Sequence, residues 1–157
     1  MKKLLLISAI TLMYFNINAQ DYTSAVGLRG GFARGLTYKH FISERVGLEG
    51  ILMSRYRGIN LTGLIEFHNE AFKTDGLKWY WGLGGHLGYY NNDYYSYYST
   101  NGYTAIIGVD AILGIEYSLK DYPFYISLDW KPTYNLFGGY HFNGDSGAIS
   151  IRYLFER

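Results

Sequence analysis

Eight stretches of the chain alternate between apolar residues and polar or small ones. Alternation with a period of two is the pattern of a β-strand with one apolar face, whereas a helix repeats every 3.6 residues. Most stretches approach the roughly 9–11 residues that a tilted strand needs to cross a bilayer, while strands of soluble domains are usually about 5–6 residues long. The stretches are residues 22–33, 35–42, 45–55, 58–68, 77–90, 103–119, 124–136 and 147–155. We therefore predict an all-β fold of about eight strands.

The stretch "KWYWGLGGHLGYY", residues 78–90, indicates which face is outside. One of its faces carries Trp79, Trp81, Leu83 and Leu87, and the opposite face is mostly glycine. Glycine on a solvated strand face costs backbone entropy and packs against nothing. The glycine face is therefore expected in a crowded interior, and the aromatic face is expected to look outward.

Charged residues follow the same division between the faces. Five basic and five acidic residues lie on the less apolar faces. Because a basic side chain facing lipid at mid-bilayer costs about 2–4 kcal/mol, this segregation is what a membrane barrel requires. We predict an interior charge network of Arg29, Lys39, Glu49, Glu66, Lys78, Asp110, Glu116, Asp129, Lys131 and Arg152. The predicted lipid-facing residues are Trp79, Trp81, Leu83, Leu87, Ile107, Val109, Leu113, Ile115, Ile126, Leu128, Trp130, Ile149, Ile151, Tyr153 and Phe155.

The first residues resemble a secretory signal peptide. Lys2 and Lys3 precede an apolar run from Leu4 to Phe15, and the small residue Ala19 follows. The run is shorter than the roughly 20 residues of a membrane-spanning helix, so we predict a signal peptide over residues 1–19 and a barrel domain over residues 20–157. The chain has no cysteine, which excludes disulfides, and its 14 basic and 13 acidic residues give no reason to expect a nucleic-acid partner.

The connections between the stretches differ in length. "ISERV" and "KDYP" are short, whereas "NNDYYSYYSTNG" and "NLFGGYHFNGDSG" are long. Outer-membrane barrels alternate short periplasmic turns with longer external loops. The pattern favours an up-and-down antiparallel transmembrane β-barrel with the short connections on the periplasmic side, although "NEAFKTDG" is long for such a turn. Tyr94, Tyr95, Tyr97 and Tyr98 would then form either an external contact site or an ordinary solvated rim.

Two segments carry a resemblance to a known family. "DAILGIEYSLKDYPFYISLDWKP" resembles the penultimate hairpin of short outer-membrane barrels, and "SIRYLF" resembles their C-terminal assembly signal, although Glu156 and Arg157 follow Phe155 here. The chain is thus similar to the small eight-stranded outer-membrane barrels of the OmpA/OmpX-like family. The resemblance implies an outer-membrane location, contact with outer-membrane lipid and with the assembly machinery, and no reaction.

Two other functional classes are alternatives for a small barrel: a lipid A-modifying enzyme and a secreted binding barrel. Some barrels of this size modify lipid A, and the loop "YHFNGDSG" contains His141, Asp145 and Ser146 close together in sequence. Nothing in their spacing enforces the geometry of nucleophilic catalysis, and the loop lacks the His and Ser two residues apart on a strand face that known lipid A deacylase barrels use. A secreted lipocalin-like barrel would require the inverse pattern, with apolar residues lining a cavity. We therefore predict no catalysis and keep both classes as alternatives.

No metal or cofactor site is predicted. His40, His68, His86 and His141 are scattered over four segments, and "GLGGHLG" neither matches GxGxxG nor opens a helix. The interior carboxylates are expected to form ion pairs, since an eight-stranded barrel leaves an interior just wide enough for side chains. The sequence predicts a monomeric structural or surface-interaction protein whose external partner it does not specify.

Overall fold

The computed structural model describes residues 24–55, 57–72, 74–91, 103–119, 122–138, 141–144 and 146–155, and all regular structure in them is β. The strands are β1 Ser24–Gly31, β2 Arg34–Phe41, β3 Val46–Arg55, β4 Gly58–Glu70, β5 Leu77–Asn91, β6 Tyr103–Ser118, β7 Phe124–Trp130, β8 Thr133–Phe137, β9 Phe142–Asn143 and β10 Gly147–Phe155. In this described part of the chain, no helix is long and apolar enough to span a membrane.

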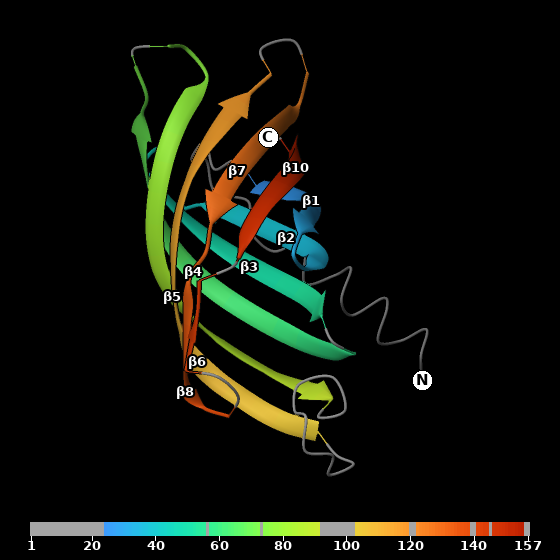
Figure 1. Cartoon of the computed structure of the whole chain (residues 1–157). Helices are drawn as coiled ribbons and strands as arrows, with labels where there is room; N and C mark the ends of the chain where they lie inside the picture. The colour runs from blue at the N-terminus through green and yellow to red at the C-terminus, as the bar shows by residue number, and fades with distance from the viewer. Residues whose placement is uncertain are drawn as a thin grey trace.

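The strands form one closed antiparallel sheet (Figure 1). Each of β1 to β6 pairs with the next strand along the chain, β7 pairs with both β6 and β10, and β10 pairs with β1. The last pairing sets Ser24 opposite Phe155. The closed circuit is an eight-stranded up-and-down barrel, so the predicted fold class is confirmed.

The predicted strand over residues 124–136 is interrupted. It divides at Lys131 and Pro132 into β7 and β8, which both pair with β6. On the other side, β7 pairs with β10 and β8 pairs with β9. Proline has no N–H to donate to the ladder. Ala111 N donates to Pro132 O at 3.0 Å across the break. The wall therefore stays continuous. β7 and β8 together occupy one strand position in the barrel, and β9 and β10 together occupy the next.

The two ends of the barrel carry different connections. One end, here called the termini end, contains the start of β1, the end of β10, and the connections over residues 42–45, 71–76 and 119–123. At the opposite end, here called the loop end, lie the ends of β1, β3, β5 and β8 and the starts of β2, β4, β6 and β9. The short connections near residues 43 and 121 thus share the end with both termini, as expected. The connections at the loop end are not all long, because the first two, between β1 and β2 and between β3 and β4, have two residues each.

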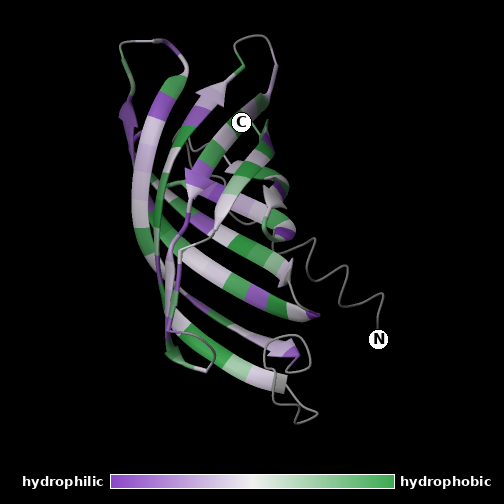
Figure 2. Ribbon diagram, in the orientation of Figure 1, coloured by the Kyte–Doolittle hydropathy of each residue, from purple (hydrophilic) through white to green (hydrophobic). Residues whose placement is uncertain are grey.

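The two faces of the wall differ in polarity. Buried and exposed residues alternate along β4, and Figure 2 shows hydrophobic and hydrophilic bands alternating along the strands. All fifteen residues predicted to face lipid are exposed on the outer surface, each by 39–59 %. The interior contains a small apolar cluster of Ile51, Leu64, Tyr80 and Ile112 together with many polar side chains. The barrel therefore places its polar residues inside and its apolar residues outside.

The glycine face of β5 lies inside the barrel. A Cβ atom on Gly82 would lie 2.5 Å from Ile65 O, and one on Gly88 would lie 2.4 Å from Ile59 O. These distances are shorter than any real Cβ contact, because the backbone of β4 passes too close. The glycines are therefore required by the tight approach of neighbouring strands, in agreement with the crowding that the sequence indicates.

Candidate functional site: the polar interior

The barrel brings most of the predicted charge network into its interior. Nine of the ten residues are at most 5 % exposed: Arg29, Lys39, Glu49, Glu66, Asp110, Glu116, Asp129, Lys131 and Arg152. The tenth, Lys78, is half-buried near the termini end of β5. It lies opposite Glu70 and Glu116 in the register of the sheet. Because an isolated buried charge is very costly, each of the nine side chains needs a partner of opposite charge or a hydrogen-bond partner.

The first group of interior charges, the Lys131 cluster, lies nearest the loop end and consists of His86, Asp110, Lys131 and Asn135. Lys131 Nζ donates to Asp110 Oδ1 at 3.0 Å, and the other carboxylate oxygen lies 2.9 Å from His86 Nδ1. The second ring nitrogen of His86 lies 2.8 Å from Asn135 Oδ1. One lysine and one carboxylate therefore pair here. The His86 ring lies between Asp110 and Asn135 of β8.

The second group, the Arg29 cluster, consists of Arg29, Tyr80, Asp129 and Ser150. Both terminal nitrogens of Arg29 donate to Asp129, one of them at 2.7 Å. Tyr80 donates its hydroxyl to the same carboxylate at 3.1 Å. A bidentate guanidinium–carboxylate pair is the strong form of such an interaction, and it joins β1 to β7 across the interior. Here too one positive charge meets one negative charge.

The third group, the Lys39 cluster, is the largest and consists of Lys39, Glu49, Glu66, His68, Glu116 and Arg152. Lys39 Nζ lies 2.6 Å from Glu66 Oε2, 3.5 Å from Glu116 Oε2 and 3.8 Å from Glu49 Oε2. Arg152 donates to Glu49 Oε1, which also accepts from Thr37. The cluster joins five strands, β2, β3, β4, β6 and β10.

Uncharged side chains also belong to the interior, and the sequence analysis did not assign them to the network. Tyr80 and Tyr125 are at most 2 % exposed and lie near Lys39, whose Nζ is 4.4 Å from the centre of the Tyr80 ring. Ser127 accepts from Arg152 at 2.6 Å. The alternating sequence pattern could have predicted their inward position, because each lies an even number of residues from a predicted interior charge in the same strand.

Little free space remains between these groups. A cavity of about 50 Å³ lies near the loop end, lined by Arg29, Asn60, Lys131 and Thr133 among others. That volume holds at most a few water molecules. The described interior is therefore packed with side chains and gives no wide aqueous passage, as expected for eight strands.

Of the three loop residues that could serve catalysis, the structure describes His141 and Ser146. His141 Nδ1 lies 3.3 Å from Asn135 O, and its ring stacks on Tyr134 with the ring centres 5.9 Å apart. Ser146 accepts from Lys131 N through its backbone oxygen. Among the described residues, no hydrogen bond joins His141 to Ser146. Asp145, like Tyr94, Tyr95, Tyr97 and Tyr98 and the predicted signal peptide, lies outside the described residues.

The histidines do not meet in a metal site. His86 belongs to the Lys131 cluster and His68 to the Lys39 cluster, while His40 Nδ1 lies 2.8 Å from Ser24 Oγ on the outer face. Within the ranges that the structure describes, no group of three or more His, Asp or Glu side chains is arranged to hold a metal ion.

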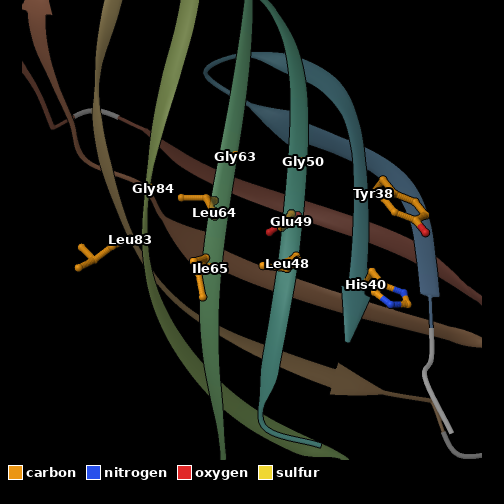
Figure 3. A pocket seen from close by; sticks show the side chains of 10 residues that line it. All are labelled: Tyr38, His40, Leu48, Glu49, Gly50, Gly63, Leu64, Ile65, Leu83 and Gly84. Carbon is orange, nitrogen blue, oxygen red and sulfur yellow. The ribbon is translucent and has the colours of Figure 1, made fainter. Parts of the chain in front are cut away.

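A hollow of about 720 Å³ lies on the outer surface over β2 to β5 (Figure 3). Three glycines that point outward, Gly50, Gly63 and Gly85, lie opposite one another on β3, β4 and β5. Unlike the interior glycines, Gly63 has nothing within 4 Å of where a Cβ would stand. Leucine and isoleucine side chains border the row, including Leu48 and Ile65. The hollow is thus a mostly apolar depression on the outside of the wall, and Glu49 of the Lys39 cluster is among the residues that line it.

Comparisons with known proteins identify the fold. No protein-family model matches the chain, and no curated protein matches its sequence. Among solved structures, the chain is similar to the N-terminal β-barrel domain of OprF from Pseudomonas aeruginosa, with a TM-score of 0.67 and 14 % sequence identity. The match covers 88 % of this chain and 100 % of that one. At this identity the likeness shows the fold alone, and the chain has the fold of a small OmpA-like eight-stranded β-barrel.

Proposed function

We propose that the chain is an integral outer-membrane β-barrel with a structural or surface-interaction role and no catalysis. The observation that supports this most is the polarity of the wall, with apolar side chains outside and paired charges inside. Water around such an outer surface would meet a continuous apolar belt, which soluble monomers rarely expose. A lipocalin-like barrel would have the opposite polarity.

The closed sheet also suits a bilayer. Inside hydrocarbon, every backbone N–H and C=O must find a partner within the protein, and a barrel achieves this because it has no free edge. The pairing of β1 with β10 supplies that closure. Among the outward strand residues, Trp79, Trp81 and Trp130 are 39–49 % exposed, and in a bilayer they would contact lipid.

The proposed orientation places the termini end in the periplasm and the loop end outside the cell. The likeness to the OprF barrel domain supports the outer membrane as the compartment. The mature chain would begin after a cleaved leader of residues 1–19, reach the membrane through the assembly machinery and remain a monomer in contact with outer-membrane lipid. The tyrosines at positions 94, 95, 97 and 98 would then be available to an external partner.

Cell fractionation combined with gel mobility tests this proposal. We expect the expressed chain in the outer-membrane fraction, with a mobility in detergent gels that changes on boiling, because the closed barrel resists unfolding by detergent at room temperature. A denatured sample serves as the unfolded reference. Recovery in the soluble periplasmic fraction, with the same mobility before and after boiling, would contradict the proposal and support a soluble barrel instead.

A further inference from the structure

Among the described interior clusters, the Lys39 cluster is the one in which the numbers of Lys or Arg and of Asp or Glu side chains differ. The Lys131 cluster and the Arg29 cluster each contain one cation and one carboxylate. In the Lys39 cluster, two cations, Lys39 and Arg152, face three carboxylates, Glu49, Glu66 and Glu116. All five residues are at most 5 % exposed. One negative charge in excess is therefore enclosed away from solvent, and such a charge is costly.

The cluster shares its cations unequally. Glu49 accepts from Arg152 and from Thr37, and Glu116 accepts from Lys39 at 3.5 Å. Among the described residues, neither oxygen of Glu66 has a hydrogen-bond partner, although Lys39 Nζ lies 2.6 Å from Oε2, because the direction of approach does not make a hydrogen bond. Of the three carboxylates, Glu66 is thus the one that accepts no hydrogen bond, and it shares the charge of Lys39 with Glu49 and Glu116.

A second orphan atom faces Glu66 from the neighbouring strand. Among the described residues, Glu49 Oε2 is buried without a hydrogen-bond partner. Glu49 is two residues from Gly47, the register partner of Glu66, and Lys39 Nζ lies 3.8 Å from Glu49 Oε2 and 2.6 Å from Glu66 Oε2, so the two carboxylates gather around one ammonium. Two carboxylates only accept hydrogen bonds, so they cannot satisfy each other. One proton between them would turn one carboxyl into a donor and satisfy an oxygen on each residue.

His68 on β4 lies against the same groups. Its Nε2 lies 3.5 Å from Lys39 Nζ, 3.5 Å from Glu116 Oε2 and 3.6 Å from Glu66 Oε2. The ring also stacks on Tyr80, with 5.1 Å between the ring centres. Lys39 and the two carboxylates therefore compete for this one ring nitrogen.

The groups in and around the cluster come from seven strands. They are Thr37 and Lys39 on β2, Glu49 on β3, His68 on β4, Tyr80 on β5, Glu116 on β6, Tyr125 and Ser127 on β7, and Arg152 on β10, with the half-buried Lys78 of β5 opposite Glu116 in the register. We propose that the folded barrel contains a proton-binding site in the Lys39 cluster, where one proton is held between Glu66 and Glu49 at neutral pH. The proton makes the cluster neutral.

The site couples folding to pH. A glutamate in the unfolded chain is ionised at pH 7, so folding takes up one proton. Since the folded state binds the extra proton, the contribution of this site to stability is full below the pKa of an unfolded glutamate and falls as the pH rises above it. Glu66→Gln removes this dependence, because the amide is neutral and can donate to Glu49 as the protonated acid does. From pH 6 to pH 8, the ratio of the wild-type to the variant folding constant should fall by about tenfold per pH unit.

The experiment uses the full mature chain folded in phospholipid vesicles. Infrared spectroscopy at pH 7 reads the carbonyl stretch of a protonated carboxylic acid, which a carboxylate lacks, and urea unfolding reads the midpoint. We expect the band in the wild type and its loss in Glu66→Gln. The midpoint of Glu66→Gln at pH 7 should be higher than that of the wild type, because the amide folds without taking up a proton. Asp129→Asn is the matched control, because it also converts a buried carboxyl to an amide but breaks the Arg29 pair. It should keep the band and lower the midpoint.

Several results would overturn the proposal. These are a wild-type spectrum without the carbonyl band, a band that survives in Glu66→Gln, and a Glu66→Gln midpoint as low as that of Asp129→Asn. Failure of Glu66→Gln to fold would count against it too, since the neutral amide should be tolerated, and the wild-type band needs no variant. A wild-type midpoint that rises with sodium at constant ionic strength, with no carbonyl band, would show that a metal ion supplies the charge instead.

Discussion

At the scale of single residues, glycine has two different meanings in this wall. Gly114 faces inward, where an added Cβ would lie 2.6 Å from Tyr80 Cζ and 2.7 Å from Asp129 Cβ. Gly63 faces outward into open space. The first glycine makes room for the Arg29 cluster, whereas the second leaves part of the outer hollow empty.

This contrast predicts opposite effects of one added methyl group. Gly114→Ala should lower stability by about 1–3 kcal/mol, because the interior must shift to accept it. Gly63→Ala should leave stability unchanged or raise it by up to about 1 kcal/mol, because alanine restricts the unfolded chain without a clash. Urea midpoints of both variants in the same vesicles measure the difference. Equal losses from the two substitutions would contradict the assignment of the faces.

At the scale of the element, a strand of this barrel is defined by which of its faces meets the interior. In β6, Leu113 is 50 % exposed and lies between Trp81 and Trp130 of the neighbouring strands, while Ile112 and Gly114 are buried. Adjacent residues therefore experience opposite surroundings, which gives a direct test of where the lipid lies.

Leu113→Arg is expected to impair membrane insertion. A basic side chain in the hydrocarbon costs up to about 2–4 kcal/mol at the midplane and about 0–1 kcal/mol near the interfaces. The matched control is Phe142→Arg on the short strand β9 at the loop end, which should insert normally. Folding yield into vesicles, read by the boiling-dependent shift in gel mobility, measures both variants. Insertion of Leu113→Arg at the yield of the parent would show that the outer face of β6 does not meet lipid.

At the scale of the whole molecule, closure makes the order of the strands circular. Ser24 and Phe155 are opposite each other in the ladder between β1 and β10, so the two ends of the described barrel lie side by side. A short linker can join them, and the turn over residues 32–33 then becomes a place where the chain can be opened without breaking a strand.

A circular permutant tests this property. A chain that begins at Ala33, continues through a short glycine linker from Phe155 to Ser24 and ends at Phe32 should fold in detergent, since exposed turns tolerate new termini. Opening the chain between Val109 and Asp110 is the control, because it cuts β6 within its ladder with β5. Circular dichroism and gel mobility measure folding. If neither permutant folds, the pairing of β1 with β10 does not bring the two ends close enough for a short linker, and the prediction is wrong.

The sequence by itself determined the fold class and the polarity of the wall. Alternation is local, so the face of Trp81 or Asp129 can be predicted without knowing which strand lies beside it, and glycine on one face of residues 78–90 already indicated a crowded interior. The break at Lys131 and Pro132 was less visible, because residues 124–136 alternate on both sides of the proline and its missing N–H has consequences only within a ladder.

Only the tertiary structure decided which charges meet. Lys39 and Glu49 lie opposite each other in the register, but Arg29 and Asp129 are 100 residues apart in the chain and lie on strands β1 and β7, which do not pair. The pairing across the interior depends on the shear and curvature of the closed sheet, which no local pattern encodes. For the same reason, the ten predicted charges carried no sign of the excess carboxylate in the Lys39 cluster. That imbalance arises only when β2, β3, β4, β6 and β10 bring their side chains to one place.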